Sequence, residues 1–353
     1  MITTRFQEAT VTPEPKLVLE VATVVASSVE MHEHIGAPIS IKAEIFEPTP
    51  TPSFVSFEKT HHFMMGFHTP DFPPKDNLRA WEEQLHVNFE LVAWYQHWDQ
   101  SALSNKLKYT CSMGKIPVIT WESWNGRSQL SENGNPYPLW DIASGVFDEL
   151  LIEQFMDMQQ TAEKFGCSEV WIRFDHEMST PPGELHWYPW QGDPENYIAA
   201  WQHVVTLSRE VGFNQAKWIF SPAWGNEDAI LYYPGKDYVD FIGLTKNQYW
   251  HDQFDLRFDT WEYRSLEELY QVDKDLESWG HPIVIVESAT GEGPQADSKA
   301  VWIKEALEFV DANEHIIGFV WYNVDSAREF EDIIFRVDSS DASIDAFQDF
   351  FND

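Results

Sequence analysis

Short apolar runs alternate with stretches in which apolar residues recur every three or four positions, from about residue 60 to the end of the chain. The runs are nearly continuous, which is typical of parallel strands buried on both faces. The three-to-four spacing is typical of helices with one buried face. Strands are predicted at 62–67, 89–95, 117–121, 169–175, 217–221, 239–244, 282–287 and 316–322. The alternation predicts an α/β fold with a parallel sheet.

Helical spacing occupies the segments between these strands. It is clearest at 77–86, 148–165, 194–211, 265–279 and 296–313, and a helix at 340–352 follows the last strand. Strands and helices in this alternation are the parts of a (β/α)8 TIM barrel. Residues 122–147 contain Asn-Gly and Asn-Pro turn signals. They predict a long loop after the third strand, of the kind that shapes a substrate cleft.

Residues 1–57 differ from the rest of the chain. They contain β-prone apolar runs and end in alternating proline and threonine, from Pro48 to Pro52. Such a sequence favours an extended spacer. We therefore expect a β-prone N-terminal extension with a Pro/Thr linker at 1–57, and a single barrel domain at 58–353.

The charge of the chain restricts its partners. Acidic residues outnumber basic ones by 58 to 23, and the formal net charge is −35. Nucleic acids and anionic membranes need a basic surface, so neither is expected to bind. The same field would repel a polyanionic substrate. A neutral polymer remains, and the 17 tryptophans supply flat aromatic faces that can stack on sugar rings.

Targeting signals and cysteine chemistry add little. No apolar stretch is long enough for a transmembrane helix, and the N-terminal residues lack the basic-then-apolar order of a signal peptide. Cys111 and Cys167 show no disulfide framework and no metal-binding spacing, so two buried thiols are expected.

Two glutamates end predicted strands. Glu177 follows the strand at 169–175, and Glu287 closes the strand at 282–287. The carboxyl ends of barrel strands form the rim where active sites lie. One carboxylic acid that protonates a leaving oxygen and one carboxylate that attacks carbon are the minimum parts for cleaving a glycosidic bond. The pair therefore indicates a glycosidase site, with Arg173 as a nearby cation.

The surroundings of the two glutamates predict different roles. Apolar neighbours of Glu177 favour its protonated form, as a general acid requires, whereas a nucleophile at Glu287 needs donors or a cation. The sequence at 176–180 reads His-Glu-Met-Ser-Thr, so the zinc motif His-Glu-x-x-His is absent and no metal is expected.

Several further segments accompany these glutamates in a fixed order. They are PVITWE at 117–122, RFDHEM at 173–178, WYPW at 187–190, WIFSP at 218–222, YYPGKDYVDFIG at 232–243, PIVIVE at 282–287 and VWYN at 320–323. In this order the chain resembles glycoside hydrolase family 26 over about residues 62–350. The resemblance implies a retaining β-glycanase with a (β/α)8 barrel and no cofactor.

The resemblance also implies individual roles. Glu177 matches the acid/base and Glu287 the nucleophile, while His176 and Arg173 would contact the substrate or the nucleophile. Aromatic residues at matching positions would line sugar subsites. They are Trp121, Trp187, Trp190 and Trp321, the last as the platform under the reacting sugar.

Four departures from the family pattern lie on the sugar-facing rim. Ser179-Thr180-Pro181-Pro182 replaces Asn-Gly after the acid/base, Ala223 replaces an asparagine, and Ser288-Ala289 follows the nucleophile. The run 245–250 also differs, so the tyrosine that donates to the nucleophile is either shifted to Tyr249 or missing. The departures leave the identity of the sugar open.

The expected activity is therefore endo-hydrolysis of internal β-1,4 linkages in a neutral polysaccharide, with β-mannan favoured by the resemblance. Mixed-linkage β-glucan, β-1,3-xylan or an exopolysaccharide would use the same mechanism. The altered rim leaves a different class open, a carbohydrate-binding barrel that does not hydrolyse. We expect a monomer. The resemblance implies a secreted or periplasmic protein, although the chain shows no signal peptide.

Overall fold

The computed structural model describes residues 61–70, 78–101, 103–125, 135–179, 187–223, 226–248, 263–325 and 333–352. The expected extension and linker at 1–57 lie outside the described residues, so the proposed domain boundary stays a prediction. Tyr249 also lies outside them. No helix in the described part of the chain has the length and apolar character needed to cross a membrane.

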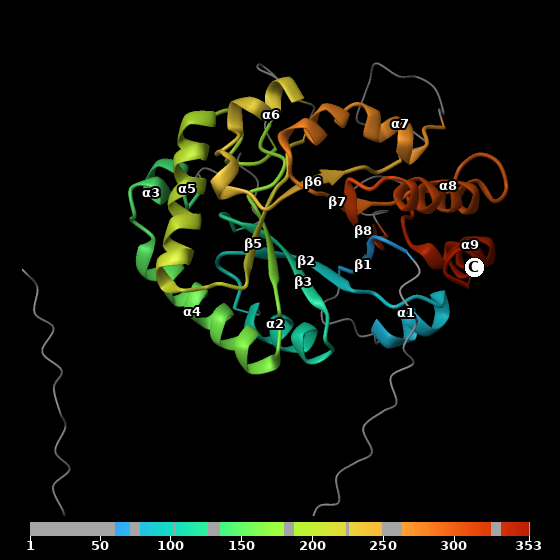
Figure 1. Ribbon diagram of the computed structural model, residues 1–353, viewed down its shortest axis with the longest axis horizontal. Coiled ribbons are helices and arrows are strands. Elements are labelled where there is room, and N and C mark those ends of the chain that lie inside the picture. Colours follow the sequence, from blue (N-terminus) through green and yellow to red (C-terminus); the bar gives the residue numbers. More distant parts are fainter. Residues whose placement is uncertain are drawn as a thin grey trace, which may run out of the picture. The chain divides into compact units, whose positions relative to one another are not determined.

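Eight parallel strands form a closed barrel in chain order, with β1 paired to both β2 and β8. The strands lie at the centre of Figure 1, with helices around them. They are β1 Met64–His68, β2 Leu91–His97, β3 Ile116–Glu122, β4 Val170–Phe174, β5 Ala216–Phe220, β6 Phe241–Thr245, β7 Ile283–Ser288 and β8 Ile316–Tyr322. The predicted (β/α)8 barrel is confirmed.

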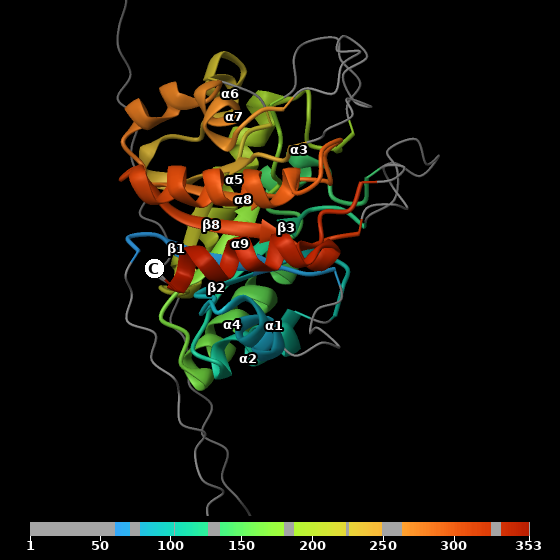
Figure 2. The same ribbon diagram turned by 90° about the vertical axis from the view of Figure 1, so that its right-hand side faces the viewer.

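Helices cover the outside of the barrel. In Figure 2, α8 and α9 run side by side along it. The helices of the described residues are α1 Leu78–Leu85, α2 Leu103–Ser112, α3 Leu139–Ala143, α4 Asp148–Phe165, α5 Pro194–Val211, α6 Asn226–Tyr232, α7 Leu266–Gln271, α8 Ser298–Ala312 and α9 Asp341–Asn352. Short 3-10 helices lie at η1 Lys236–Tyr238, η2 Lys274–Trp279 and η3 Val337–Ser339. The helix predicted at 265–279 is therefore two elements, α7 and η2.

The bounds of α5 follow from capping chemistry. Asp193 accepts a hydrogen bond from the backbone N–H of Asn196, and Pro194 occupies the first turn, where its missing N–H costs nothing. The helix ends at Gly212, whose φ of 92° is left-handed, a conformation that glycine adopts without strain. These signals place α5 at the predicted bounds.

Each strand presents alternate residues to two different layers. One layer fills the barrel interior and the other packs between strands and helices. The interior cluster comprises Leu91, Ala93, Val118, Trp171, Ile219, Val284, Val286 and Val320. The outer layer includes Val92, Trp94, Ile119, Trp121, Ile172, Phe174, Phe319 and Trp321. The last inward residues of the strands therefore form the mouth of the barrel.

The expectation of two buried thiols is wrong, because Cys111 and Cys167 form a disulfide. Cys111 lies in the last turn of α2, and Cys167 follows Gly166 at the end of α4. These helices flank β3 and pack against each other, which brings together two residues 56 positions apart. With no other cysteine in the chain, local spacing carries no signal of such a pair.

Reducing this disulfide is expected to destabilise the barrel. A cross-link that closes a loop of this length removes unfolded-state entropy worth about 4 kcal/mol in the chain-entropy model. Calorimetry with and without reductant should therefore show a Tm several degrees lower in reductant. The double variant Cys111→Ala/Cys167→Ala is the control and should not respond. An equal Tm in both conditions for the natural chain would contradict the pairing.

Candidate active site

One guanidinium joins the two predicted catalytic carboxylates. Arg173 is fully buried in β4, and its Nη1 lies 3.2 Å from Glu287 Oε2 while its Nη2 lies 3.8 Å from Glu177 Oε1. Nη2 also donates to the Thr245 hydroxyl at 2.6 Å, and Nε donates to the Ser221 hydroxyl at 3.0 Å. Glu177 follows β4 and Glu287 lies near the end of β7. The structure thus brings both carboxylates to the mouth, within the span of one side chain.

Glu287 is held by three donors. Oε2 accepts hydrogen bonds from the Tyr95 hydroxyl at 2.6 Å and from Arg173. Oε1 accepts from Asn247 Nδ2 at 3.3 Å. Donors and a cation stabilise negative charge on a carboxylate. This environment suits an ionised nucleophile with a fixed orientation.

Glu177 contacts the same cation, but its pKa is raised. Burial raises the pKa of Glu177, Arg173 lowers it, and Glu287 raises it further. Hydrogen bonds with Thr245 and Trp187 lower this pKa. The net result is a raised pKa, because burial outweighs the favourable charge of Arg173. A carboxyl that retains its proton toward neutral pH is suited to general acid catalysis.

The backbone that carries Glu177 is strained. Asp175 and Glu177 have φ angles of 38° and 54°, a region that costs non-glycine residues about 1–3 kcal/mol each. Hydrogen bonds hold this conformation: the Glu177 N–H donates to Ser221 O at 2.7 Å, and Gln191 Nε2 donates to Glu177 O at 2.7 Å. The Asp175 carboxylate accepts from the Ser123 N–H and hydroxyl. Strain maintained in this way is typical of functional sites.

His176 lies behind the surface of the mouth. It is only 1% exposed, and its Nε2 lies 3.1 Å from the Tyr188 hydroxyl. Burial and then the charge of Arg173 hold the pKa of His176 well below its usual value, so the imidazole is neutral. Tyr188 is partly exposed. Burial raises the pKa of Tyr188, and its hydroxyl lies near enough to Glu177 and Glu287 for both charges to raise that pKa further.

The predicted aromatic lining divides into two groups. Trp187 is 40% exposed and hydrogen-bonds Glu177, so it lies at the mouth. Trp190 is fully buried and stacks against Tyr188 with ring centroids 4.7 Å apart. Its indole N–H donates to His176 O at 2.7 Å. Trp190 therefore supports the wall of the site from behind.

Trp121 and Trp321 do not face the mouth, contrary to the roles implied by the resemblance. Trp121 packs against Phe155 of α4, and Trp321 packs against Trp302 of α8 and Phe347 of α9. Both are at most 1% exposed. Successive strand residues point to opposite faces of the sheet. A shift of one position along a strand therefore moves a side chain from the barrel interior to the layer beneath the helices.

Tyr322, the residue after Trp321, takes the inward position on β8. Its ring stacks on His68 with centroids 4.8 Å apart. His68 also contacts the ring of Tyr95 edge-on at 5.4 Å. Burial lowers the pKa of His68 to about 3, so this imidazole is neutral. Tyr322 is thus the β8 aromatic residue beside the site.

Sequence reasoning missed Tyr95 and the polar pair Glu122 and His97. Tyr95 and His97 lie on β2, and Glu122 ends β3 directly opposite His97 in the sheet. The carboxylate of Glu122 is 3% exposed and lies 2.9 Å from His97 Nε2. Polar residues at the ends of otherwise apolar strands were the available signal.

Replacing Tyr95 by phenylalanine is expected to lower kcat about tenfold to a hundredfold, because a hydrogen bond to a charged group contributes about 1.5–3 kcal/mol. Burial, followed by the charge of Glu287, holds the pKa of Tyr95 well above its usual value, so its hydroxyl donates at neutral pH. Steady-state kinetics on a glycan substrate give the measurement. Tyr270→Phe is the matched control, since Tyr270 donates to Glu277 outside the barrel. Equal losses in both variants would contradict a role at Glu287.

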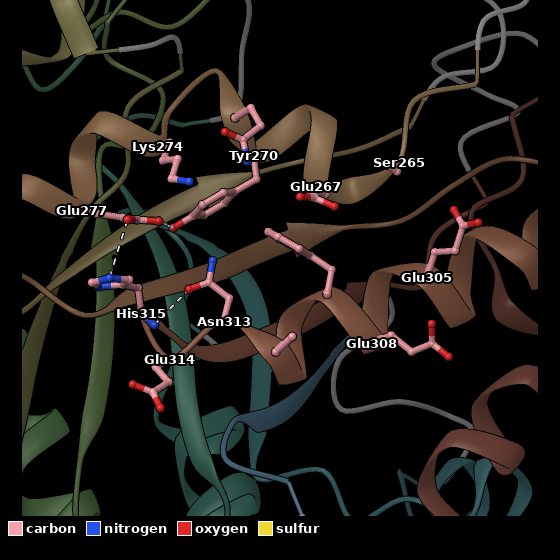
Figure 3. Close-up of a pocket in the computed structure, with 13 residues that line it drawn as sticks. Ser265, Glu267, Tyr270, Lys274, Glu277, Glu305, Glu308, Asn313, Glu314 and His315 are labelled. Carbon is pink, nitrogen blue, oxygen red and sulfur yellow. Dashed lines mark hydrogen bonds and ion pairs between the residues drawn. The ribbon is translucent and has the colours of Figure 1, made fainter.

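A separate groove of about 790 Å³ lies on the outer helices, between α7 with η2 and α8. Figure 3 shows the Tyr270 ring directed toward Glu277 within it. Its acidic lining residues are Glu267, Glu277, Glu305, Glu308 and Glu314. Neither Glu177 nor Glu287 lines this groove, so the chemistry at the barrel mouth does not extend to it.

A curated relative supports the glycanase resemblance. No family model matches the chain. Endoglucanase H of Acetivibrio thermocellus is 27% identical over 296 residues, which cover 78% of this chain and 29% of that protein. The chain therefore spans less than a third of the length of this relative.

Solved structures show the fold. The family 26 β-mannanase BoMan26A of Bacteroides ovatus matches with a TM-score of 0.59 and 15% identity, covering 83% of this chain and 89% of that one. The catalytic domain of a family 26 endo-β-1,4-mannanase from Bacillus sp. JAMB-750 matches with a TM-score of 0.57 and 15% identity, covering 83% and 86%. The predicted resemblance is confirmed: the chain has the (β/α)8 fold of glycoside hydrolase family 26 β-mannanases.

Proposed function

We propose that the chain is a retaining endo-β-glycanase that hydrolyses internal β-1,4 linkages of a neutral polysaccharide. The observation that carries the proposal is the Arg173 guanidinium between Glu177 and Glu287. It contacts both carboxyl groups. The pKa of Glu177 is raised, and Glu287 accepts hydrogen bonds from Tyr95, Arg173 and Asn247. A retaining glycosidase needs this combination, with its carboxyl groups about 5–5.5 Å apart.

The reaction takes place in two displacements. Glu177 donates its proton to the glycosidic oxygen as the bond to the anomeric carbon breaks, and Glu287 forms a bond to that carbon. Glu177, now ionised, takes a proton from water, and the water oxygen displaces Glu287 from the anomeric carbon. Arg173 stabilises the negative charge that moves between the two carboxylates during this exchange.

β-Mannan is the proposed substrate. The fold shared with β-mannanases and the neutral character expected of the ligand support it. Mixed-linkage β-glucan is the alternative, because the curated relative is by name an endoglucanase. β-1,3-Xylan or an exopolysaccharide would fit the same carboxylate pair.

The proposal is tested with purified protein on mannan, lichenan, xylan and cellulose, with products identified by mass spectrometry. The natural chain should release oligosaccharides from one of these polymers, and Glu287→Ala should release none above background. Full hydrolysis by Glu287→Ala would refute its role. Tight binding measured by calorimetry, with no product from the natural chain, would instead favour a carbohydrate-binding barrel.

We also infer that the protein works in an oxidising compartment. The Cys111–Cys167 disulfide supports this, because disulfides persist in exported proteins and are rare in reducing cytosol. An exported enzyme would meet polymeric substrates outside the cell.

A further inference from the structure

A chain of polar side chains forms the wall of the mouth beside Glu177. It begins at Glu122, whose Oε2 lies 2.9 Å from His97 Nε2 and whose Oε1 lies 3.7 Å from His176 Nδ1. It continues from His176 Nε2 to the Tyr188 hydroxyl at 3.1 Å. The neighbours of each imidazole determine which nitrogen carries the proton.

The His97 end of the chain is fixed by Gln100. The backbone N–H of His97 donates to Gln100 Oε1 at 3.3 Å. This bond orients the Gln100 amide so that its Nε2 lies 3.4 Å from the ring nitrogen Nδ1 of His97. An amide nitrogen only donates, so Nδ1 of His97 accepts and its proton lies on Nε2. The carboxylate oxygen nearest to that proton is Oε2 of Glu122, 2.9 Å from Nε2.

His176 has a single ring proton because burial and the charge of Arg173 keep it neutral. Its Nδ1 is buried without a hydrogen bond, and Oε1 of Glu122 lies 3.7 Å away as an electrostatic contact. A nitrogen lone pair directed at a carboxylate oxygen would be repelled, whereas an N–H is attracted. The proton therefore lies on Nδ1, and the lone pair of Nε2 accepts the hydroxyl proton of Tyr188.

This arrangement determines what Tyr188 offers to a ligand. Burial, followed by the charge of Glu177, holds the pKa of Tyr188 well above its usual value, so the phenol keeps its one proton. That proton is donated inward to His176, and the stacked indole of Trp190 holds the ring in place. The Tyr188 oxygen thus presents only lone pairs to the mouth.

We propose that Glu122 is a positioning residue which, through His176, makes the Tyr188 hydroxyl a hydrogen-bond acceptor for a sugar hydroxyl beside the bond that is cleaved. The proposal rests on the proposed function, since it takes a sugar as the ligand. Tyr188 would select glycans whose hydroxyl at that position is free and would reject deoxygenated or O-alkylated units there.

The first test reads the His176 tautomer in the protein without substrate. NMR of protein with ¹⁵N-labelled histidine should show the proton on Nδ1 of His176, assigned by comparison with His176→Asn. In Glu122→Gln the oxygen of the new amide accepts from His97, so the amide nitrogen faces Nδ1 of His176. That nitrogen can only donate, so the ring proton of His176 should move from Nδ1 to Nε2. A proton on Nε2 in the natural protein would overturn the proposal, as would an unchanged tautomer in Glu122→Gln.

The second test compares an oligosaccharide that the enzyme cleaves with analogues in which single hydroxyls are replaced by fluorine, which cannot donate a hydrogen bond. The natural enzyme should lose about tenfold in kcat/KM for one analogue, as expected for one lost hydrogen bond. Tyr188→Phe and Glu122→Gln should each abolish that discrimination. The double variant should be no worse than Tyr188→Phe, because both act through one hydroxyl.

The matched control is Tyr233→Phe, because the Tyr233 hydroxyl lies 2.7 Å from His281 Nε2 in a comparable pair outside the mouth. It should leave the discrimination intact. Discrimination that persists in Tyr188→Phe would overturn the proposal. If the natural protein cleaves no glycan, the proposed function fails. The tautomer measurement still decides whether Glu122 sets the position of the ring proton of His176.

Discussion

Replacement of Glu177 by glutamine is expected to lower the hydrolysis of an unactivated glycan by about 10²–10⁴-fold, the usual contribution of general acid–base catalysis. The loss should be much smaller for the first step on an aryl glycoside with a good leaving group, because the oxygen of the departing aryl group needs no proton. The glycosyl-enzyme would then accumulate, since the second step lacks its base. Burst kinetics with a dinitrophenyl glycoside measure both effects.

The activity is also expected to depend on pH through Glu177. Burial raises the pKa of Glu177, and the acid must be protonated to act, so activity should fall as pH rises through that raised pKa. Glu177→Gln should lack this alkaline limb. The control is Glu169→Gln, since Glu169 precedes β4 at the other end of the barrel and accepts from Trp171 Nε1. An unchanged alkaline limb in Glu177→Gln would assign the acid to another residue.

Arg173→Met is expected to reduce both stability and activity. Removing one partner from a buried ion pair costs about 3–5 kcal/mol, because the remaining charge is left uncompensated. Here two carboxylates, Glu177 and Glu287, would lose the same cation. Hydrolysis should fall at least as far as in Tyr95→Phe, because Arg173 donates to the same oxygen of Glu287 as Tyr95 does and also carries a charge.

Thermal unfolding across pH separates this electrostatic effect from loss of packing. In Arg173→Met the deficit in Tm should shrink as pH falls, because protonation removes the uncompensated carboxylate charge that the guanidinium neutralised. Arg336→Met serves as the control, since Arg336 pairs with Asp338 at the surface and exposed pairs contribute at most about 1 kcal/mol. A deficit that does not vary with pH would show that Arg173 acts through packing alone.

The barrel could be predicted from sequence because its signals are local. Apolar runs mark the strands. α4 and α5 were predicted at their observed bounds from their apolar spacing, and each ends at a glycine, Gly166 or Gly212. Glu177 and Glu287 were identifiable because each ends a strand, and strand ends of a barrel meet at one rim.

The remaining features depend on contacts that local patterns do not encode. Tyr95 meets Glu287 across the barrel, 192 positions away in the chain, and no periodicity links them. The exchange of Trp321 for Tyr322 follows from a one-residue offset on β8, which apolar composition cannot resolve because both faces of the strand are buried. The disulfide depends on α2 and α4 being neighbours.

Covalent trapping distinguishes Glu287 from the other carboxylates as the nucleophile. A 2-deoxy-2-fluoro glycoside with a good leaving group slows the second displacement, so a retaining enzyme should accumulate a glycosyl-enzyme that peptide mass spectrometry can locate. We expect the label on Glu287. A label on Glu177 or on another carboxylate, or an inverted product with no label from an active enzyme, would contradict it.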